Sequence, residues 1–202
     1  MQRIQDALVD GYTEYQMIEC SLDKAKELAR QFAASYETEI SKQARWRRRR
    51  SGIACAKFLT LADDQTVRGV LMVTAEGKGL IRREALADAN QARIQLGGYE
   101  MVHDGVSWSW RFSAATMKQW KTSIHRAIAK DDQNQLLEII RRLYRCAGFR
   151  LVRKQVGELV NYIRGEWRRL RNGPPPPLPT FLPYIKRLPD DWSPVEISRL
   201  AA

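Results

Sequence analysis

Residues 99–112, YEMVHDGVSWSWRF, carry the clearest structural signal in the chain. Apolar and polar residues alternate on both sides of Asp104-Gly105, a dipeptide preferred in two-residue hairpin turns. The pattern predicts two antiparallel strands in which Met101 lies opposite Trp108 and Tyr99 lies opposite Trp110. One face then carries the aromatic side chains, which form core or, as the alternative, a base-stacking platform. The other face is expected to be solvated.

The segments before this hairpin predict a mixed arrangement of strands and helices. Ser21 is a natural N-cap for an amphipathic helix over residues 21–36, and the aromatic, branched run before it, residues 12–20, is typical of a strand. Two further strand-like runs, separated by a short polar segment, predict a second hairpin over residues 53–74. Residues 82–93 are expected to form another helix.

After the hairpin, apolar residues recur at helical spacing in three segments. The first is capped by Ser113 and runs to about residue 129, the second extends from Asp131-Asp132 to Gly148, and the third covers residues 151–171. The expected fold class is α+β: a small antiparallel sheet with helices packed on one face, followed by a helical hairpin and an extended proline-rich C-terminal tail. The corresponding sections are 1–130, 131–173 and 174–202.

The tail begins with four prolines and should start as a polyproline II segment. The residues that follow are too apolar for a free linker: Leu178, Phe181, Leu182, Tyr184, Ile185, Leu188 and Trp192. Two interpretations remain open. The tail lies across its own domain, or it is a docking peptide for a partner protein.

Charge is the main functional signal. The 202 residues hold 34 Lys and Arg against 23 Asp and Glu, a net charge of +11. The excess comes from two blocks, residues 41–57 with a net charge of +7 and residues 141–171 with +8. Clustered arginines of this kind most often meet phosphate backbones. The first hypothesis is therefore a non-enzymatic nucleic-acid-binding protein, with DNA slightly favoured over RNA.

The candidate contact residues lie in both blocks. The arginine run between the helix at 21–36 and the next strand is expected to be a mobile loop, in which arginine forks grip phosphates and a tryptophan stacks on a base. The last helix carries a basic flank about 90–120° from its apolar stripe, and the turn before it is similar to a helix-turn-helix connection. The candidates are Lys42, Arg45, Trp46, Arg47, Arg48, Arg49 and Arg50 in the run and Arg150, Arg153, Lys154, Arg164 and Arg168 on the helix.

Two other classes of function remain open. Asp63 or Asp64, followed by Glu76 and Lys78, imitates the order of carboxylates and lysine in metal-dependent nucleases, although these residues more naturally mark a turn and a loop. A protein-assembly subunit that docks through residues 174–202 is the other alternative. With two histidines and neither CxxC nor HExxH, no metal site, cofactor or catalytic residue is predicted.

The sequence also predicts a cellular location and a general likeness to known proteins. We expect a cytoplasmic protein without membrane contact, because no apolar run approaches ~18 residues, no signal peptide is evident, and Cys20, Cys55 and Cys146 are odd in number and widely spaced. In its general composition, which is rich in arginine and includes several tryptophans, the chain looks like accessory replication, transfer or regulatory proteins of bacterial plasmids and phages. That likeness covers no particular residues.

Overall fold

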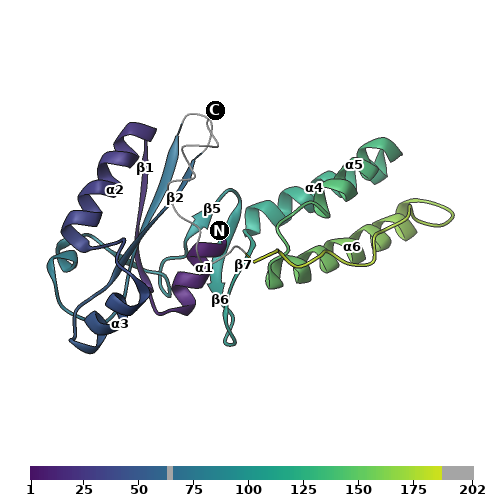
Figure 1. Cartoon of the computed structure of the whole chain (residues 1–202). Coiled ribbons are helices and arrows are strands. Elements are labelled where there is room, and N and C mark those ends of the chain that lie inside the picture. Colours follow the sequence, from purple (N-terminus) through teal and green to yellow (C-terminus); the bar gives the residue numbers. More distant parts are fainter. Residues whose placement is uncertain (63–65, 188–202) are drawn as a thin grey trace. The chain divides into compact units, whose positions relative to one another are not determined.

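The computed structural model describes residues 1–62 and 66–187, and the predicted α+β class is confirmed (Figure 1). The chain forms two compact units, one built from Met1–Arg93 and the other from Ile94–Lys186. The hairpin at residues 99–112 belongs to the second unit, together with the basic helices. The three sections expected from the sequence, 1–130, 131–173 and 174–202, stay a prediction.

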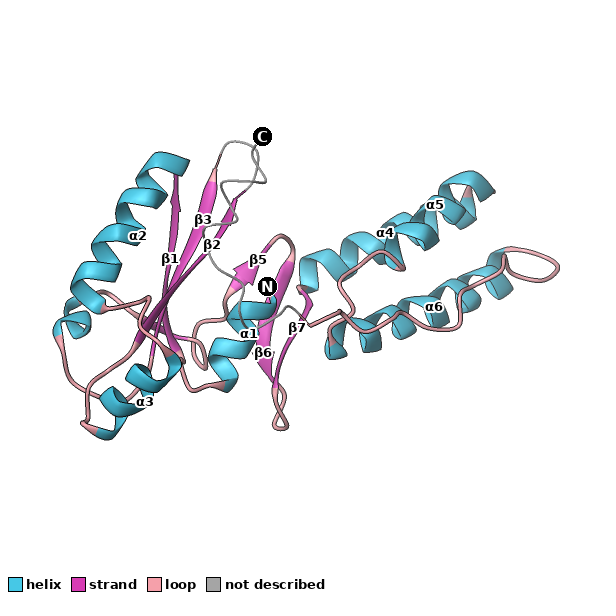
Figure 2. Ribbon diagram, viewed as in Figure 1, coloured by secondary structure: helices cyan, strands magenta, loops and turns pink. Residues whose placement is uncertain are grey.

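The first unit is built on a four-stranded antiparallel sheet (Figure 2). Its strands are β1 (Glu14–Cys20), β2 (Ala56–Ala62), β3 (Val67–Val73) and β4 (Ala87–Asp88), in the order β2-β3-β1-β4. The predicted strand before residue 21 and the predicted hairpin of β2 and β3 are therefore confirmed. The long strand β3 lies between β2 and β1 and is buried over most of its length.

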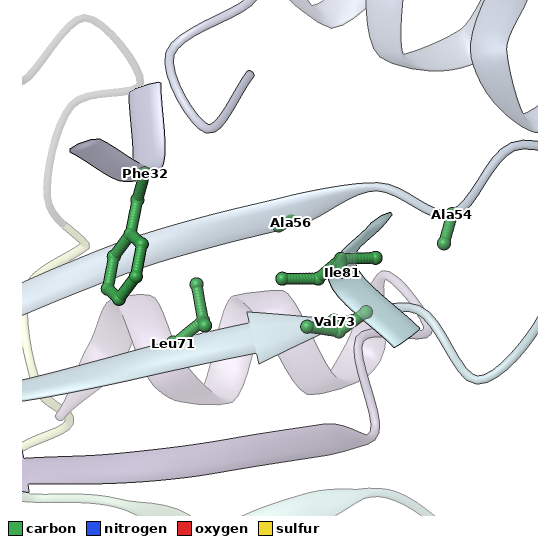
Figure 3. Close-up of a cluster of buried hydrophobic side chains, with 6 residues drawn as sticks. All are labelled: Phe32, Ala54, Ala56, Leu71, Val73 and Ile81. Carbon is green, nitrogen blue, oxygen red and sulfur yellow. The ribbon is translucent and has the colours of Figure 1, made fainter. Parts of the chain in front are cut away.

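Helix α2 (Leu22–Tyr36) packs on this sheet and completes the core of the first unit. Its N-terminus is capped as predicted, because the Ser21 hydroxyl accepts a hydrogen bond from the Lys24 amide. Phe32 of α2 meets Leu71 and Val73 of β3 in a cluster with Ile81 (Figure 3). A short helix that the sequence did not predict, α1 (Gln2–Val9), contacts β2 and β3.

The arginine run is not a loop, so that prediction is wrong. It forms helix α3 (Lys42–Arg50), capped by Ser41, whose hydroxyl accepts a hydrogen bond from the Ala44 amide. Four arginines occupy the last turn, where positive charge is favourable beside the negative end of the helix dipole. Charge repulsion within the run therefore does not prevent a helix, since the cap and the dipole offset it.

The helix expected over residues 82–93 is also absent. The segment contains a single 3₁₀ turn, η1 (Leu80–Arg83), followed by β4 and a turn in which the Asp88 carboxylate accepts a hydrogen bond from the Asn90 amide. Arg82 donates to the carbonyls of Gly77 and Thr74 and pairs with Glu14. These local and tertiary hydrogen bonds compete with those of a helix. The helical spacing of the apolar residues in this segment therefore predicted a helix that does not form.

The second unit contains the predicted hairpin in a different register. Its sheet has the strands β5 (Gln95–Leu96), β6 (Tyr99–His103) and β7 (Trp108–Phe112). Met101 pairs with Trp110 rather than with Trp108, and Tyr99 pairs with Phe112. The connecting loop has four residues instead of two, because the Asp104 carboxylate accepts hydrogen bonds from the amides of Val106 and Ser107.

Both faces of the hairpin are buried. Met101, Trp108, Trp110 and Phe112 form core, which confirms the core interpretation and excludes a base-stacking platform. The opposite face was expected to be solvated, and that prediction is wrong: Val102, Ser109 and Glu100 are buried as well. The Ser109 hydroxyl accepts a hydrogen bond from the Leu151 amide, and Glu100 pairs with Arg111.

Three helices complete the second unit: α4 (Ala114–Ala129), α5 (Gln133–Leu143) and α6 (Arg150–Leu170). All three were predicted, although α5 ends before Gly148. Helix α4 contacts both α5 and α6. The side-chain amide of Gln155 on α6 donates to the carbonyl of Phe112 and accepts from its amide, so α6 is fixed to the edge of β7.

Candidate nucleic-acid interface

Three arginines of α3 form contacts within the first unit. Arg45 donates to the carbonyl of Ile40 at 2.8 Å, and Arg48 pairs with Glu37. Arg49 donates to the carbonyl of Asp10 at 2.8 Å, and its guanidinium lies 4.8 Å from the ring centre of Tyr12. These contacts tie α3 to the segment after α1 and to the end of α2.

Tyr12 is a buried anchor for two cations. Its ring also receives the ammonium of Lys57 at 4.5 Å, and the same ammonium lies 3.1 Å from the Asp10 carboxylate. Burial raises the pKa of Tyr12 and lowers the pKa of Lys57, in each case by disfavouring the charged form. Arg49 and Lys57 are thus committed to cation–π contacts that hold the fold.

The other side of α3 is exposed and basic. We call it the α3 outer face and define it as Lys42, Trp46, Arg47 and Arg50. Trp46 is 56% exposed, and the guanidinium of Arg50 lies 4.9 Å from its ring centre. Within the described residues, none of the three cations on this face has an acidic partner. An exposed tryptophan among unpaired cations is costly to leave in water and is typical of a binding surface.

Two of the candidate residues on α6 have structural partners. Arg150 pairs with Asp104 at 2.7 Å and donates to the Ser107 hydroxyl at 3.2 Å, which fixes the hairpin loop. The hydrogen bond from Arg150 is the main reason that the pKa of Asp104 lies far below its ordinary value. Arg153 donates to the carbonyl of Leu182 at 2.7 Å, and its guanidinium lies 3.5 Å from the ring centre of Tyr184.

The remaining candidates on α6 form a second exposed basic surface. We call it the α6 outer face and define it as Lys154, Arg164 and Arg168, which lie on one side of the helix. Arg164 donates to the Asn161 side chain at 3.3 Å, and Arg168 donates to the carbonyl of Arg164 at 3.4 Å. In the part of the chain that the structure describes, none of the three pairs with a carboxylate. This face therefore offers phosphate contacts, and none of its three residues is aromatic.

The tail packs on its own unit as far as the structure describes it. Tyr144 donates to the carbonyl of Pro179 at 2.7 Å, and the Ile185 amide donates to the carbonyl of Gly148 at 3.3 Å. Leu182 is only 5% exposed, and the tail follows α6 as the yellow segment in Figure 1. Leu188 and Trp192, which the sequence grouped with these residues, lie outside the described residues.

The tail also covers the connection between α5 and α6. A β-carbon at Gly148 would lie 1.8 Å from the carbonyl oxygen of Pro183, so only glycine fits under the tail. The turn that was predicted to be similar to a helix-turn-helix connection is therefore covered by the tail. Gly148 and Arg153 are the residues that contact the tail there.

Helix α4 adds basic residues that sequence reasoning missed. It contains Lys118, Lys121 and Arg126, all exposed, and no acidic residue. They were overlooked because residues 58–140 hold ten basic and ten acidic groups and cancel when counted as one segment. Counted by structural unit, residues 94–186 hold 16 basic and 7 acidic side chains, a net charge of +9. Division of the chain at element boundaries would have found this helix.

The nuclease-like pattern does not assemble into a visible site. Asp63 and Asp64 lie outside the described residues. Ala62, the neighbour of Asp63 in sequence, pairs with Val67 at one end of the β2–β3 hairpin, whereas Glu76 follows Val73 at the other end, six residue steps or roughly 20 Å along the strand. Lys78 instead bridges to Ile53, and a β-carbon at Gly77 would lie 2.3 Å from the Ala54 nitrogen. Over residues 1–62 and 66–187, no three His, Cys, Asp or Glu side chains are placed to hold a metal ion.

Comparison with known proteins gives no identification: no protein-family model matches the chain, and no curated protein or solved structure matches it significantly. Among the helices of the described residues, none has the length and apolar character needed to span a membrane. Function is therefore inferred from the basic surfaces themselves.

Proposed function

We propose that this protein binds nucleic acid, with the α3 outer face as the principal contact surface. The observation that carries the proposal is the combination on one helix face of three cations without acidic partners and one exposed tryptophan. Arginine guanidinium groups match phosphate oxygens in bidentate geometry. A tryptophan between them supplies a stacking surface for a base.

The α6 outer face supports the same function as a second, purely electrostatic surface. Its three cations project from the unit that carries the larger net charge. Contacts of this kind attract a phosphate backbone without reading its sequence. Because Trp46 can stack only on an unpaired base, we expect single strands to bind more tightly than duplexes.

The direct test is binding of labelled single-stranded DNA, duplex DNA and RNA across a salt series, with and without Mg²⁺. Binding should weaken steeply with salt, and the nucleic acid should remain intact when Mg²⁺ is present. Trp46→Ala should weaken single-strand binding by roughly 5- to 100-fold and duplex binding much less. Val9→Ala, which removes an equally exposed apolar side chain from α1, is the control and should change neither.

Three results would contradict the proposal. Weak binding to all three polymers at low salt would mean that the basic faces meet a protein instead. Equal loss of single-strand and duplex binding in Trp46→Ala would remove the stacking role. Mg²⁺-dependent cleavage that Glu76→Gln abolishes would show a nuclease rather than a binding protein.

A further inference from the structure

An open hollow lies between α4 and α6, and no residue of the α6 outer face lines it. Its volume is about 520 Å³, and it is lined mainly by Met117, Lys118, Lys121, His125 and Tyr162. Lys118, Lys121 and His125 follow one another at helical spacing on α4. Tyr162 faces them from α6, with the Lys121 ammonium 5.8 Å from its ring centre.

His125 is held at the rim of this hollow by a buried carboxylate. Its Nδ1 lies 2.6 Å from Glu166, which is among the few buried charged residues described. Arg169 donates to both oxygens of the same carboxylate at 2.7 Å. Burial of Glu166 opposes its ionisation, but the hydrogen bonds from His125 and Arg169 outweigh burial and keep its pKa below the ordinary value.

An ionised Glu166 fixes the proton on the histidine ring. A carboxylate only accepts hydrogen bonds, so Nδ1 of His125 must carry a proton and donate it. The other nitrogen, Nε2, is then left for a ligand, and the half-exposed ring makes it accessible. In the imidazolium form Nε2 donates a hydrogen bond, whereas in the neutral form it presents a lone pair that would repel an anion.

We infer that this hollow is a binding site for a phosphate group, held by Lys118, Lys121 and the imidazolium of His125. Lys118, Lys121 and His125 line the hollow from the same helix, and neither lysine has an acidic partner in the described ranges. Met117 and Tyr162 add an apolar wall that suits the sugar or base attached to a phosphate. The phosphate belongs to a nucleic-acid backbone, in which case the site rests on the proposed function, or to a free phosphate compound.

The groups around His125 come from both helices. Glu166 on α6 holds its Nδ1 and pairs with Arg169, and Tyr162 stays neutral because burial raises its pKa.

The chain offers a clean reporter, because it contains only two histidines. The experiment follows the ring nitrogens of His125 by NMR in a full-length His103→Gln background. A short oligothymidylate and inorganic phosphate are added in two separate series at about pH 6. We expect a saturable shift of Nε2 with at least one of them.

Two variants separate binding from folding. Lys118→Gln with Lys121→Gln removes the lysines from exposed positions and should abolish the shift while the fold is retained. Lys130→Gln, at an exposed position after the end of α4, is the matched control and should leave it intact. A shift with oligothymidylate identifies the backbone as source, and a shift with inorganic phosphate alone identifies a free compound.

The inference is overturned if neither probe gives a saturable shift, or if the double lysine variant responds like the wild type. Its failure differs from failure of the proposed function. Loss of the α3 outer face should strongly weaken polymer binding but leave the response of His125 to inorganic phosphate unchanged.

Discussion

Helices α3 and α6 are both strongly basic, but they use their charge differently. On α3 the residues divide by side: Arg45, Arg48 and Arg49 face their own unit, and the α3 outer face is left without acidic partners around Trp46. On α6 the residues divide by position. Arg150 and Arg153, near the N-terminus, are held by the hairpin loop and the tail, and the α6 outer face begins at the next residue, Lys154, and extends to Arg168.

This difference shows that a basic block in a sequence is not the same as a basic surface. An arginine carries five N–H donors on a planar group, so it can satisfy backbone carbonyls and cover aromatic rings as well as bind phosphate. Five of the twelve candidate residues are held by partners outside their own helix: Arg45, Arg48, Arg49, Arg150 and Arg153. What distinguishes the α3 outer face from the α6 outer face is that one of its own residues, Trp46, is an exposed aromatic side chain.

The largest expected effect separates the two outer faces. The triple variant Lys42→Ala/Arg47→Ala/Arg50→Ala should weaken single-strand binding on the order of a hundredfold at low salt and reduce the salt slope by about two. The triple variant Lys154→Ala/Arg164→Ala/Arg168→Ala removes the same charge and should weaken binding only about tenfold. Fluorescence anisotropy over a salt series measures both. Equal losses would mean that net charge alone, and not the α3 outer face, drives binding.

The next effect concerns the contact between the tail and the connection that precedes α6. Gly148→Ala places a methyl group against the Pro183 carbonyl and should cost roughly 1–3 kcal/mol, because the tail must shift. Gly157→Ala is the control: its β-carbon would meet nothing within 4 Å, and alanine should stabilise this mid-helix position by roughly 0.5–1 kcal/mol. Thermal melts and limited proteolysis of residues 174–187 measure the difference. A stable, protease-resistant Gly148→Ala variant would show that the tail does not rest there.

A smaller effect should follow loss of the structural arginines of α3. Arg48→Ala/Arg49→Ala removes the pair with Glu37 and the contact with Tyr12, and should lower the free energy of unfolding by about 1–2 kcal/mol. Arg47→Ala/Arg50→Ala leaves these contacts in place and should change stability by less than about 0.5 kcal/mol. Chemical denaturation compares the two. The reverse order would contradict the division of α3 into two sides.

The smallest effect is the pH dependence of Glu166. Because its pKa is lowered in the folded state, it contributes stability above its unfolded pKa and loses that contribution as the pH falls through the folded value. The wild type should therefore lose stability below about pH 4.5 more steeply than Glu166→Gln does. Melting temperatures across acidic pH provide the measurement. Parallel curves for the two proteins would mean that His125 and Arg169 do not hold an ionised carboxylate.

Local patterns predicted most elements of the fold but not their tertiary use. Ser21, Ser113 and Asp132 mark helix starts, because side-chain capping depends only on neighbours in sequence. The hairpin register was wrong because Asp104 bonds to two loop amides, a choice that the Asp-Gly pair alone does not specify. The 82–93 segment failed as a helix because Arg82 has partners far away in sequence.

The basic residues of the candidate site could be predicted from the sequence, but their partners and their exposure could not. Both basic blocks were found in the sequence. That Arg47 lies on the exposed side of α3 and Arg48 on the side that contacts its own unit follows only from the helical structure of the run. Engagement of Arg153 by the tail depends on residues about 30 positions later in the chain, at Leu182 and Tyr184. The His125–Glu166 pair joins residues 41 positions apart and has no local signal.

The most direct test of the central claim compares two double variants of α3 that remove equal charge from the same helix. Binding of labelled single-stranded DNA is measured for Arg47→Ala/Arg50→Ala and for Arg48→Ala/Arg49→Ala at temperatures where both are folded. The outer pair should lose affinity by roughly tenfold or more, and the inner pair should bind within about twofold of the wild type. Equal losses, or a larger loss for the inner pair, would contradict the assignment of the α3 outer face as the nucleic-acid interface.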